Sequence, residues 1–212
     1  MQDKNILVFG ASGALGRQIL QQALQAGANV TAFVRDPRRL ALRHERLRVR
    51  IGDVLYDRET VAAAIRGQDA VISALGSGKL LGADSLMQRC LLAIRLGMQR
   101  AQVKRLIVTS AFGVGNSVND APVLMRVLYR LLMKQVFDDK AASEAQLVKS
   151  DLEWTVVYPV MLTNGPRTQS YRAGEKIAVN GFATVSRADV ADFILKQLED
   201  ARFVRKVPVV TS

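Results

Sequence analysis

The sequence contains very little cysteine and histidine: one of each, Cys90 and His44, among 212 residues. A lone cysteine cannot form an intramolecular disulfide, and two such residues are too few for a Cys/His zinc site. A Ser-His-Asp hydrolase would have to use His44, which lies among arginines after the second strand region, so we give that chemistry little weight. Cys90 lies in an apolar helical run, and we expect it to be a small core residue.

Long apolar runs are also missing, and we expect no leader segment. No stretch approaches the roughly 18 uninterrupted apolar residues of a membrane span. The charged first five residues run straight into the apolar segment 6–9, without the long apolar run and cleavage site of a signal peptide. We therefore expect a cytoplasmic protein with no membrane span. Apolar residues make up 49% of the chain, which is enough for a sizeable core.

Acidic residues are outnumbered: 19 Asp and Glu stand against 30 Lys and Arg, which gives a net charge of +11. Such an excess of positive charge can indicate binding to nucleic acid, to an anionic membrane or to an anionic small ligand. Aromatic residues are only 6% of the chain, so we do not expect nucleic-acid binding. In the segment 123–134 the cations stand at positions 126, 130 and 134, on one stripe of a helix. This stripe could suit a membrane surface, but we favour a helix buried on most sides, for example against a second subunit of a homodimer.

Short apolar runs alternate with longer helical patterns along the whole chain. Strands are predicted at 6–9, 30–34, 47–51, 70–75, 105–109, 154–158 and 207–210. Helices are predicted at 14–26, 58–66, 85–101, 123–134 and 138–149, and a last one, capped by Ser186, extends to about 198. Nearly continuous apolar strands that alternate with helices indicate a parallel sheet covered on both faces. We predict an α/β protein with one doubly wound Rossmann domain over residues 1–212, and small substrate-side insertions near 111–122 and 160–185.

A glycine-rich turn joins the first strand to the first helix, with the spacing Gly10-x-x-Gly13-x-x-Gly16. Glycine permits a tight turn and a close approach of the backbone to phosphate, and a helix N-terminus offers unpaired N–H groups to an anion. An ordinary βα turn is the alternative, but the strand–turn–helix context favours a dinucleotide site. The expected contacts are Gly10, Ser12, Gly13, Ala14, Leu15 and Gly16.

The end of the second strand indicates which dinucleotide. An NAD site places an acidic residue there to accept the ribose hydroxyls, whereas this strand ends in Arg35, followed by Arg38 and Arg39. Guanidinium groups suit the 2′-phosphate of NADPH. A solvated basic edge is the alternative for these arginines, and Asp36 keeps NAD as a second interpretation. We predict NADPH (NADP⁺) as the cofactor.

Two later strand ends could complete the site. Asp53 could accept a hydrogen bond from the adenine amino group, with Val54 packed on the ring, although an ordinary turn aspartate would have the same sequence. The fourth strand ends in Ala74-Leu75-Gly76, where small residues would let the cofactor ribose lie close to the backbone.

Several motifs occur together and in a characteristic order: Gly10–Gly16, Val34-Arg35-Asp36, Gly52-Asp53-Val54, Thr109-Ser110-Ala111, Asp139-Lys140-Ala141 and Val157-Tyr158-Pro159. In this respect the chain resembles atypical short-chain dehydrogenases/reductases, and within them the NAD(P)H-binding flavin/biliverdin reductase group. The resemblance implies that Ser110 lies beside the nicotinamide and the acceptor, and that Lys140 lies near the cofactor ribose. It also implies that the backbone of Pro159, Val160 and Met161 passes along the carboxamide. A strand-end serine, a surface lysine and a turn proline are the alternatives.

The chain departs from the standard Tyr-x-x-x-Lys pattern of that superfamily. Val136 stands four residues before Lys140, Phe137 has no proton to donate, and Tyr129 and Tyr158 are off register. Reduction of an ordinary ketone needs a positioned proton donor, whereas a conjugated ring system spreads the incoming charge and could be protonated by water. We therefore predict an NADPH-dependent reductase of a planar conjugated acceptor: flavin (FMN or FAD), a bilin or a quinone. The alternative is a non-catalytic NADP(H) sensor or assembly factor.

Overall fold

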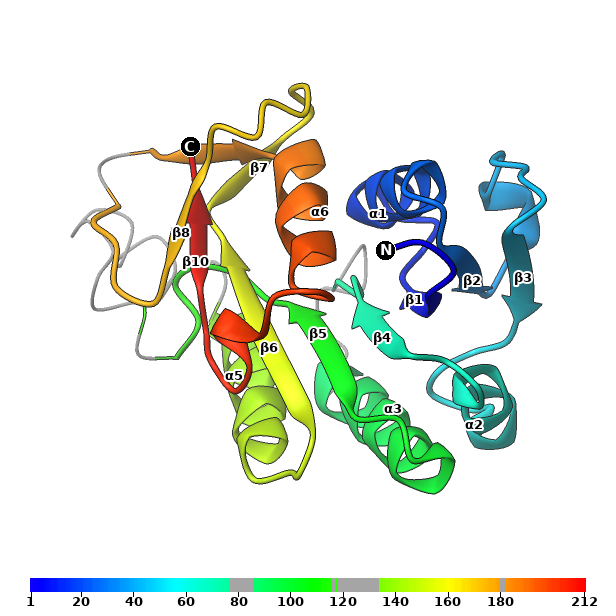
Figure 1. Cartoon of the computed structure of the whole chain (residues 1–212). Helices are drawn as coiled ribbons and strands as arrows, with labels where there is room; N and C mark the ends of the chain where they lie inside the picture. The colour runs from blue at the N-terminus through cyan, green and yellow to red at the C-terminus, as the bar shows by residue number, and fades with distance from the viewer. Residues whose placement is uncertain (77–85, 116, 118–133, 180–181) are drawn as a thin grey trace.

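A computed structural model describes residues 1–76, 86–115, 117, 134–179 and 182–212 (Figure 1). The strands of its central sheet are β1 (Asn5–Phe9), β2 (Asn29–Val34), β3 (Leu47–Ile51), β4 (Ala70–Ser73), β5 (Arg105–Thr109), β6 (Glu153–Pro159), β8 (Arg172–Gly174) and β10 (Val209–Thr211). They lie in the order β3-β2-β1-β4-β5-β6-β10-β8, and every pair of neighbours is parallel except β10 and β8. The strand order reverses between β1 and β4, as in a doubly wound fold.

The helices cover both faces of this sheet, which confirms the predicted Rossmann fold (Figure 1). They are α1 (Ala14–Gln25), α2 (Arg58–Ile65), α3 (Leu86–Ala101), α5 (Lys134–Val148) and α6 (Arg187–Lys196). On one face α1 packs against α6, and on the other α3 lies between α2 and α5. The central strand β1 has no exposed side chain from Ile6 to Phe9, because helices cover it on both sides.

Local signals set the ends of several helices. Ser186 Oγ accepts a hydrogen bond from the N–H of Asp189 at 2.9 Å and caps α6, as the sequence predicts. Gly27 closes α1 with a φ of +81°, a conformation that glycine adopts at little cost. The first turn of α3 is capped from another helix: the carboxylate of Asp139 on α5 accepts from the N–H groups of Met87 (2.7 Å) and Gln88 (3.2 Å).

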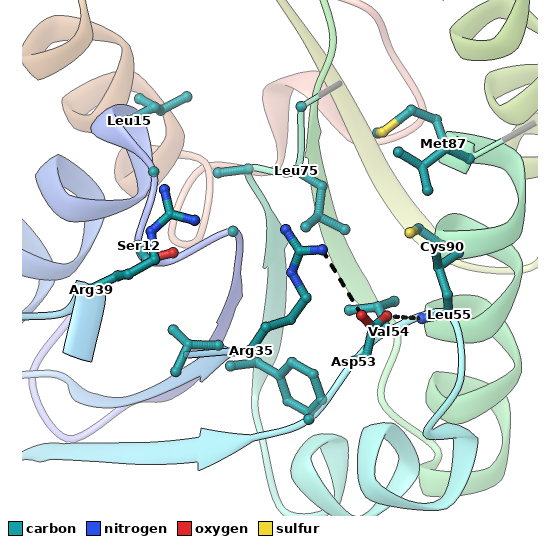
Figure 2. A pocket seen from close by; sticks show the side chains of 18 of the residues that line it. Ser12, Leu15, Arg35, Arg39, Asp53, Val54, Leu55, Leu75, Met87 and Cys90 are labelled. Carbon is teal, nitrogen blue, oxygen red and sulfur yellow. Dashed lines mark hydrogen bonds and ion pairs between the residues drawn. The ribbon is translucent and has the colours of Figure 1, made fainter. Parts of the chain in front are cut away.

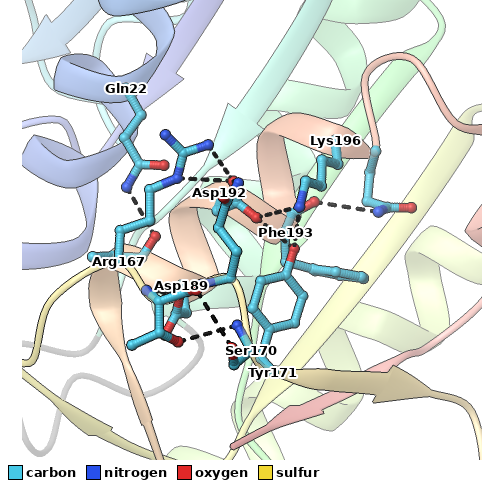
Figure 3. Close-up of polar contacts among 12 residues, drawn as sticks. Gln22, Arg167, Ser170, Tyr171, Asp189, Asp192, Phe193 and Lys196 are labelled. Carbon is cyan, nitrogen blue, oxygen red and sulfur yellow. Dashed lines mark hydrogen bonds and ion pairs between the residues drawn. The ribbon is translucent and has the colours of Figure 1, made fainter.

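The segment after β6 forms short strands that the sequence did not predict. β7 (Met161–Thr163) pairs in parallel with β9 (Thr184–Ser186) in a separate two-stranded sheet. The loop between β7 and β8 is fastened to α6 by two carboxylates (Figure 3). Asp189 accepts from the N–H groups of Thr168 and Gln169 at 2.7 and 2.8 Å. Asp192 pairs with Arg167, with Lys196 at 2.7 Å and with the Tyr171 hydroxyl at 2.6 Å.

Other boundaries differ from the prediction by a few residues. β4 ends at Ser73, two residues earlier than expected, and the last strand is Val209–Thr211. The predicted helix 123–134 lies outside the described residues except for Lys134, which begins α5. No helix among the described residues is long and apolar enough to cross a membrane.

Candidate functional site

A cleft of about 520 Å³ opens at the carboxyl ends of β1, β2 and β4, where the strand order reverses (Figure 2). Open α/β sheets bind their ligands at this position. Its lining residues are Gly10, Ser12, Gly13, Ala14, Leu15, Phe33, Val34, Arg35, Arg39, Gly52, Asp53, Val54, Leu55, Ala74, Leu75, Gly76, Leu86, Met87, Cys90 and Arg187. Twelve of these are residues that the sequence predicts to contact the cofactor.

The glycine turn is as tight as the motif requires. Gly10 has a φ of +75°, and a Cβ there would lie 2.5 Å from the Ala74 carbonyl oxygen. Gly16 is not among the residues that line the cleft. A Cβ there would lie 2.2 Å from the carbonyl oxygen of Gly10, so the glycine lets helix α1 pack against the turn. Gly13 is the N-cap of α1 and has no side chain to cover the first-turn N–H groups, which have no partner within the helix.

Two of the three predicted arginines line the cleft. In Figure 2 the side chain of Arg35 reaches into the space between Ser12 and α3, and its guanidinium lies 4.0 Å from the Asp53 carboxylate. Arg39 lies in the 3₁₀ helix η1 (Pro37–Arg39) and lines the same space.

The third arginine is engaged elsewhere. Arg38 donates to the Asp36 carboxylate through Nε (2.9 Å) and Nη2 (3.1 Å), and it is not among the residues that line the cleft. These bonds, together with the N–H of Arg38, hold the pKa of Asp36 below its ordinary value. The carboxylate of Asp36 is therefore already hydrogen-bonded, which weakens the interpretation that it binds ribose hydroxyls.

Asp53 acts as a turn aspartate, which was the alternative to an adenine-binding residue, and it also lines the cleft. One carboxylate oxygen accepts from the N–H of Leu55 at 2.9 Å, while the other lies toward Arg35. Val54 beside it is buried and lines the cleft with Phe33. This end of the cleft offers an acceptor next to an apolar surface.

The opposite wall comes from α3, which the sequence-based prediction of the site did not include. Leu86, Met87 and Cys90 line the cleft, and Met87 and Cys90 lie on the α3 side of it, across from Leu75 (Figure 2). Burial raises the pKa of the Cys90 thiol to about 11, so the thiol is neutral near pH 7. Arg187, at the start of α6, also lines the cleft and donates to Asn164 at 2.7 Å. The apolar spacing of this segment indicates a helix with a buried face, but it does not predict that the first turn of α3 reaches the edge of the sheet.

A polar cluster lies at the same edge of the sheet. Ser110 follows β5, and because Ser73 of β4 pairs with Val108 of β5, Ser110 stands next to the β4 end that lines the cleft. Ser110 Oγ is hydrogen-bonded to Glu144 Oε1 at 2.5 Å, and the Tyr158 hydroxyl is bonded to the other oxygen of Glu144.

Lys140, one turn before Glu144 on α5, is buried beside this cluster. Burial lowers the pKa of Lys140 and raises the pKa values of Glu144 and Tyr158, since it disfavours the charged form of each group. The structure thus brings the two predicted residues Ser110 and Lys140 to one group of side chains, and adds Glu144 and Tyr158, which the prediction did not include.

The remaining predicted residues continue from β6 but do not line the cleft. Pro159 ends β6 and accepts from the N–H of Phe112 at 3.0 Å. The N–H of Val160 donates to Val210, and that of Met161 donates to Ala183. Val160 is buried and Met161 is half-exposed, so their placement beside a nicotinamide stays a prediction.

A model of the NAD(P)H-binding family matches residues 10–201. The chain belongs to this NAD(P)H-binding family. Its fold and family confirm the resemblance to atypical short-chain dehydrogenases/reductases that the motifs indicate.

Relatives of the NAD(P)H-binding family include proteins of different roles. The photosystem II assembly factor Ycf39 of Synechocystis is 26% identical over 98% of this chain, and the chain spans 62% of that protein's length. The structure of ChuY, an anaerobillin reductase from Escherichia coli O157:H7, has a TM-score of 0.79 at 25% identity, covering 98% of this chain and 96% of that one. A short-chain dehydrogenase/reductase from Veillonella parvula in complex with NADP has a TM-score of 0.84 at 20% identity, covering 99% and 94%.

Proposed function

We propose that this NAD(P)H-binding protein is an NADPH-dependent reductase of a planar conjugated acceptor, such as a flavin (FMN or FAD), a bilin or a quinone. The observation that supports it most is the composition of a single cleft. A glycine turn, two guanidinium groups and an apolar wall line it, and the Ser110 cluster stands at the adjoining strand end.

The glycine turn fits a diphosphate. The cradle exists only because Gly10 and Gly16 lack a Cβ, which would collide with backbone at either position. The uncapped first turn of α1 offers N–H groups to an anion in the way that dinucleotide-binding helices do. We assign the phosphate bridge to the N–H groups of residues 12–15, with Gly13 leaving room for the close approach.

The arginines favour NADPH over NADH. Arg35 and Arg39 both line the cleft, and they suit the dianionic 2′-phosphate. The carboxylate that could have bound a free ribose, Asp36, is held by Arg38. A structural neighbour in complex with NADP is in keeping with this assignment.

Bound NADPH supplies hydride from C4 of its nicotinamide ring. The chain's own residues would hold and orient the two rings, because proximity and alignment provide most of the advantage in such a transfer. Leu75 and Met87 line the cleft and would shield the two rings from water, and Ser110 would orient the acceptor through its hydroxyl. Pro159, Val160 and Met161 would line the carboxamide side. Val136 at the standard tyrosine position favours a conjugated acceptor over a simple ketone.

The test is a plate or stopped-flow assay of NADPH oxidation against FMN, FAD, riboflavin, biliverdin and a series of quinones, with NADH as the comparison. We expect turnover with at least one planar acceptor and a preference for NADPH. Tight NADPH binding without oxidation by any acceptor would contradict the proposal.

A second function, a non-catalytic NADP(H) sensor or assembly factor, is favoured by the similarity to Ycf39. It predicts that the protein distinguishes NADPH from NADP⁺ in affinity but does not catalyse the oxidation of NADPH by any acceptor. Isothermal titration with both forms, beside the acceptor panel, separates the two functions.

A further inference from the structure

The Ser110–Glu144–Tyr158 cluster has a use beyond orienting the acceptor, and this inference rests on the proposed reductase function. We propose that Glu144 is the proton reservoir of the reaction, and that its proton reaches the reduced acceptor through the hydroxyl of Ser110. The sequence alone suggested water as the immediate proton source. In this proposal water only restores the proton on Glu144.

Hydrogen bonds hold both oxygens of the Glu144 carboxyl group. Glu144 lies on α5, half-buried, and its two oxygens are each occupied: Oε1 by Ser110 at 2.5 Å and Oε2 by the Tyr158 hydroxyl. Ser110 follows β5 and Tyr158 lies in β6. Three neighbouring elements therefore converge on one carboxyl group at the edge of the sheet where the cleft opens.

The protonation state of Glu144 decides what Ser110 can do, because a serine hydroxyl has a single proton. If Glu144 is ionised, Ser110 donates its proton to the carboxylate and can only accept from an acceptor molecule. If Glu144 is neutral, its O–H donates to the Ser110 oxygen, and the Ser110 proton is free to point at the acceptor. Only the neutral form of Glu144 makes Ser110 a proton donor.

The proton transfer balances with one proton drawn from the solvent per turnover. The acceptor receives an electron pair with the hydride and becomes basic at a ring nitrogen or oxygen. A bond forms between that atom and the Ser110 proton as the Ser110 O–H bond breaks. The Glu144 O–H bond breaks in turn and restores the serine hydroxyl. Glu144 is left as a carboxylate, which takes its next proton from water.

The surroundings suit both forms of the carboxyl group. Burial raises the pKa of Glu144, while the hydrogen bonds from Ser110 and Tyr158 and the charge of Lys140 act in the opposite direction. Tyr158, whose own pKa is raised, stays protonated and donates to Glu144 throughout. Lys140 is the cation next to the carboxylate that forms.

Other charged groups near this helix have partners of their own. Asp139, also on α5, is turned to α3, where the N–H groups of Met87 and Gln88 hold it. Arg89 and Cys90 of α3 lie in the same helical turn as those N–H groups. Among the described residues, the ionisable groups that shift the pKa of Glu144 are thus Tyr158 and Lys140.

The test compares Glu144→Gln with Glu175→Gln, an exposed glutamate that pairs with Lys206 and does not line the cleft. Glutamine can still donate an N–H to Ser110, but it cannot release a proton. At saturating NADPH and FMN, or whichever panel acceptor is reduced, wild-type kcat should fall about tenfold per pH unit above the pKa of Glu144. Glu144→Gln should lower kcat about 100-fold or more and remove this pH limb, with NADPH affinity unchanged within about twofold. Glu175→Gln should behave as wild type.

A second variant and a second readout exclude a merely structural role. Tyr158→Phe removes a hydrogen bond that lowers the pKa of Glu144, so the pH limb should move to higher pH. Infrared pH titration of the protein without acceptor should show a protonated-carboxyl band that Glu144→Gln lacks and Glu175→Gln retains.

The outcomes separate this inference from the proposed function. If the wild type reduces an acceptor but Glu144→Gln keeps the wild-type pH profile, the relay is wrong and the reductase function stands. The same holds if the infrared band is absent over the pH range of activity. If no acceptor is reduced, the function and the relay are both wrong.

Discussion

Replacing Gly13 by valine should abolish NADPH binding while leaving the fold intact. Gly13 has φ −72° and ψ 165°, which any residue adopts, and its added Cβ would meet only the Gly10 carbonyl oxygen, at 3.1 Å. We expect a loss of less than about 1 kcal/mol in unfolding free energy. The rest of the side chain would project into the cleft, where the phosphate bridge is assigned. Two N–H bonds to a charged oxygen contribute roughly 1.5–3 kcal/mol each, so NADPH affinity should fall about 10²–10⁴-fold.

Fluorescence titration of NADPH measures the affinity and thermal unfolding measures the fold. The melting temperature of Gly13→Val should stay within about 4 °C of wild type. Gly16→Ala is the opposite case: its Cβ would lie 2.2 Å from Gly10 O, so it should destabilise the fold by about 1–3 kcal/mol. Gly165→Ala, whose Cβ would make an ordinary 3.4 Å contact, is the control. Wild-type NADPH affinity in a folded Gly13→Val protein would refute the assignment of the phosphate site.

Two further predictions concern buried groups. Cys90 is buried and its pKa is raised to about 11, so it should react with iodoacetamide at pH 8 at least tenfold more slowly than free cysteine. The reaction should be slower still with NADPH bound. Labelling at the rate of free cysteine would contradict the burial of Cys90. Asp192→Asn should lower the unfolding free energy by about 2–3 kcal/mol near pH 7, because the carboxylate holds four partners: Arg167, Gln169, Tyr171 and Lys196. The pKa of Asp192 is lowered to about 2. Its contribution to stability is therefore complete above the ordinary Asp pKa of about 4 and disappears as the pH falls through 2. Urea unfolding of both proteins from pH 7 to pH 2 measures this change, and a difference in unfolding free energy that stays constant with pH would refute the reasoning.

The sequence predicted the parts of the site that depend on local patterns. The glycine turn, the arginine after β2 and the Ser186 cap each follow from residue types within a few positions of one another. Apolar periodicity located the main strands and helices of the fold. The strands β7, β8 and β9 have three residues each, which is too short to show a period, so hydrophobic patterning could not predict them.

The contacts that escaped prediction join residues far apart in the chain. Glu144 meets Ser110 across 34 positions, and no spacing rule links a helix residue to a strand end at that distance. The first turn of α3 reaches the cleft because Asp139 on α5 holds it there. The pairing of Arg38 with Asp36 is local, but the sequence alone left both side chains free to face the cofactor.

The most direct test of the central claim compares NADPH with NADH in binding to the wild type and to the double variant Arg35→Ala/Arg39→Ala. Arg48→Ala, an exposed residue of the edge strand β3, is the control. If the two guanidinium groups hold the 2′-phosphate, the double variant should lose NADPH affinity by about 10–100-fold and NADH affinity by less than about twofold. Equal losses for the two cofactors, or no loss for either, would contradict the account.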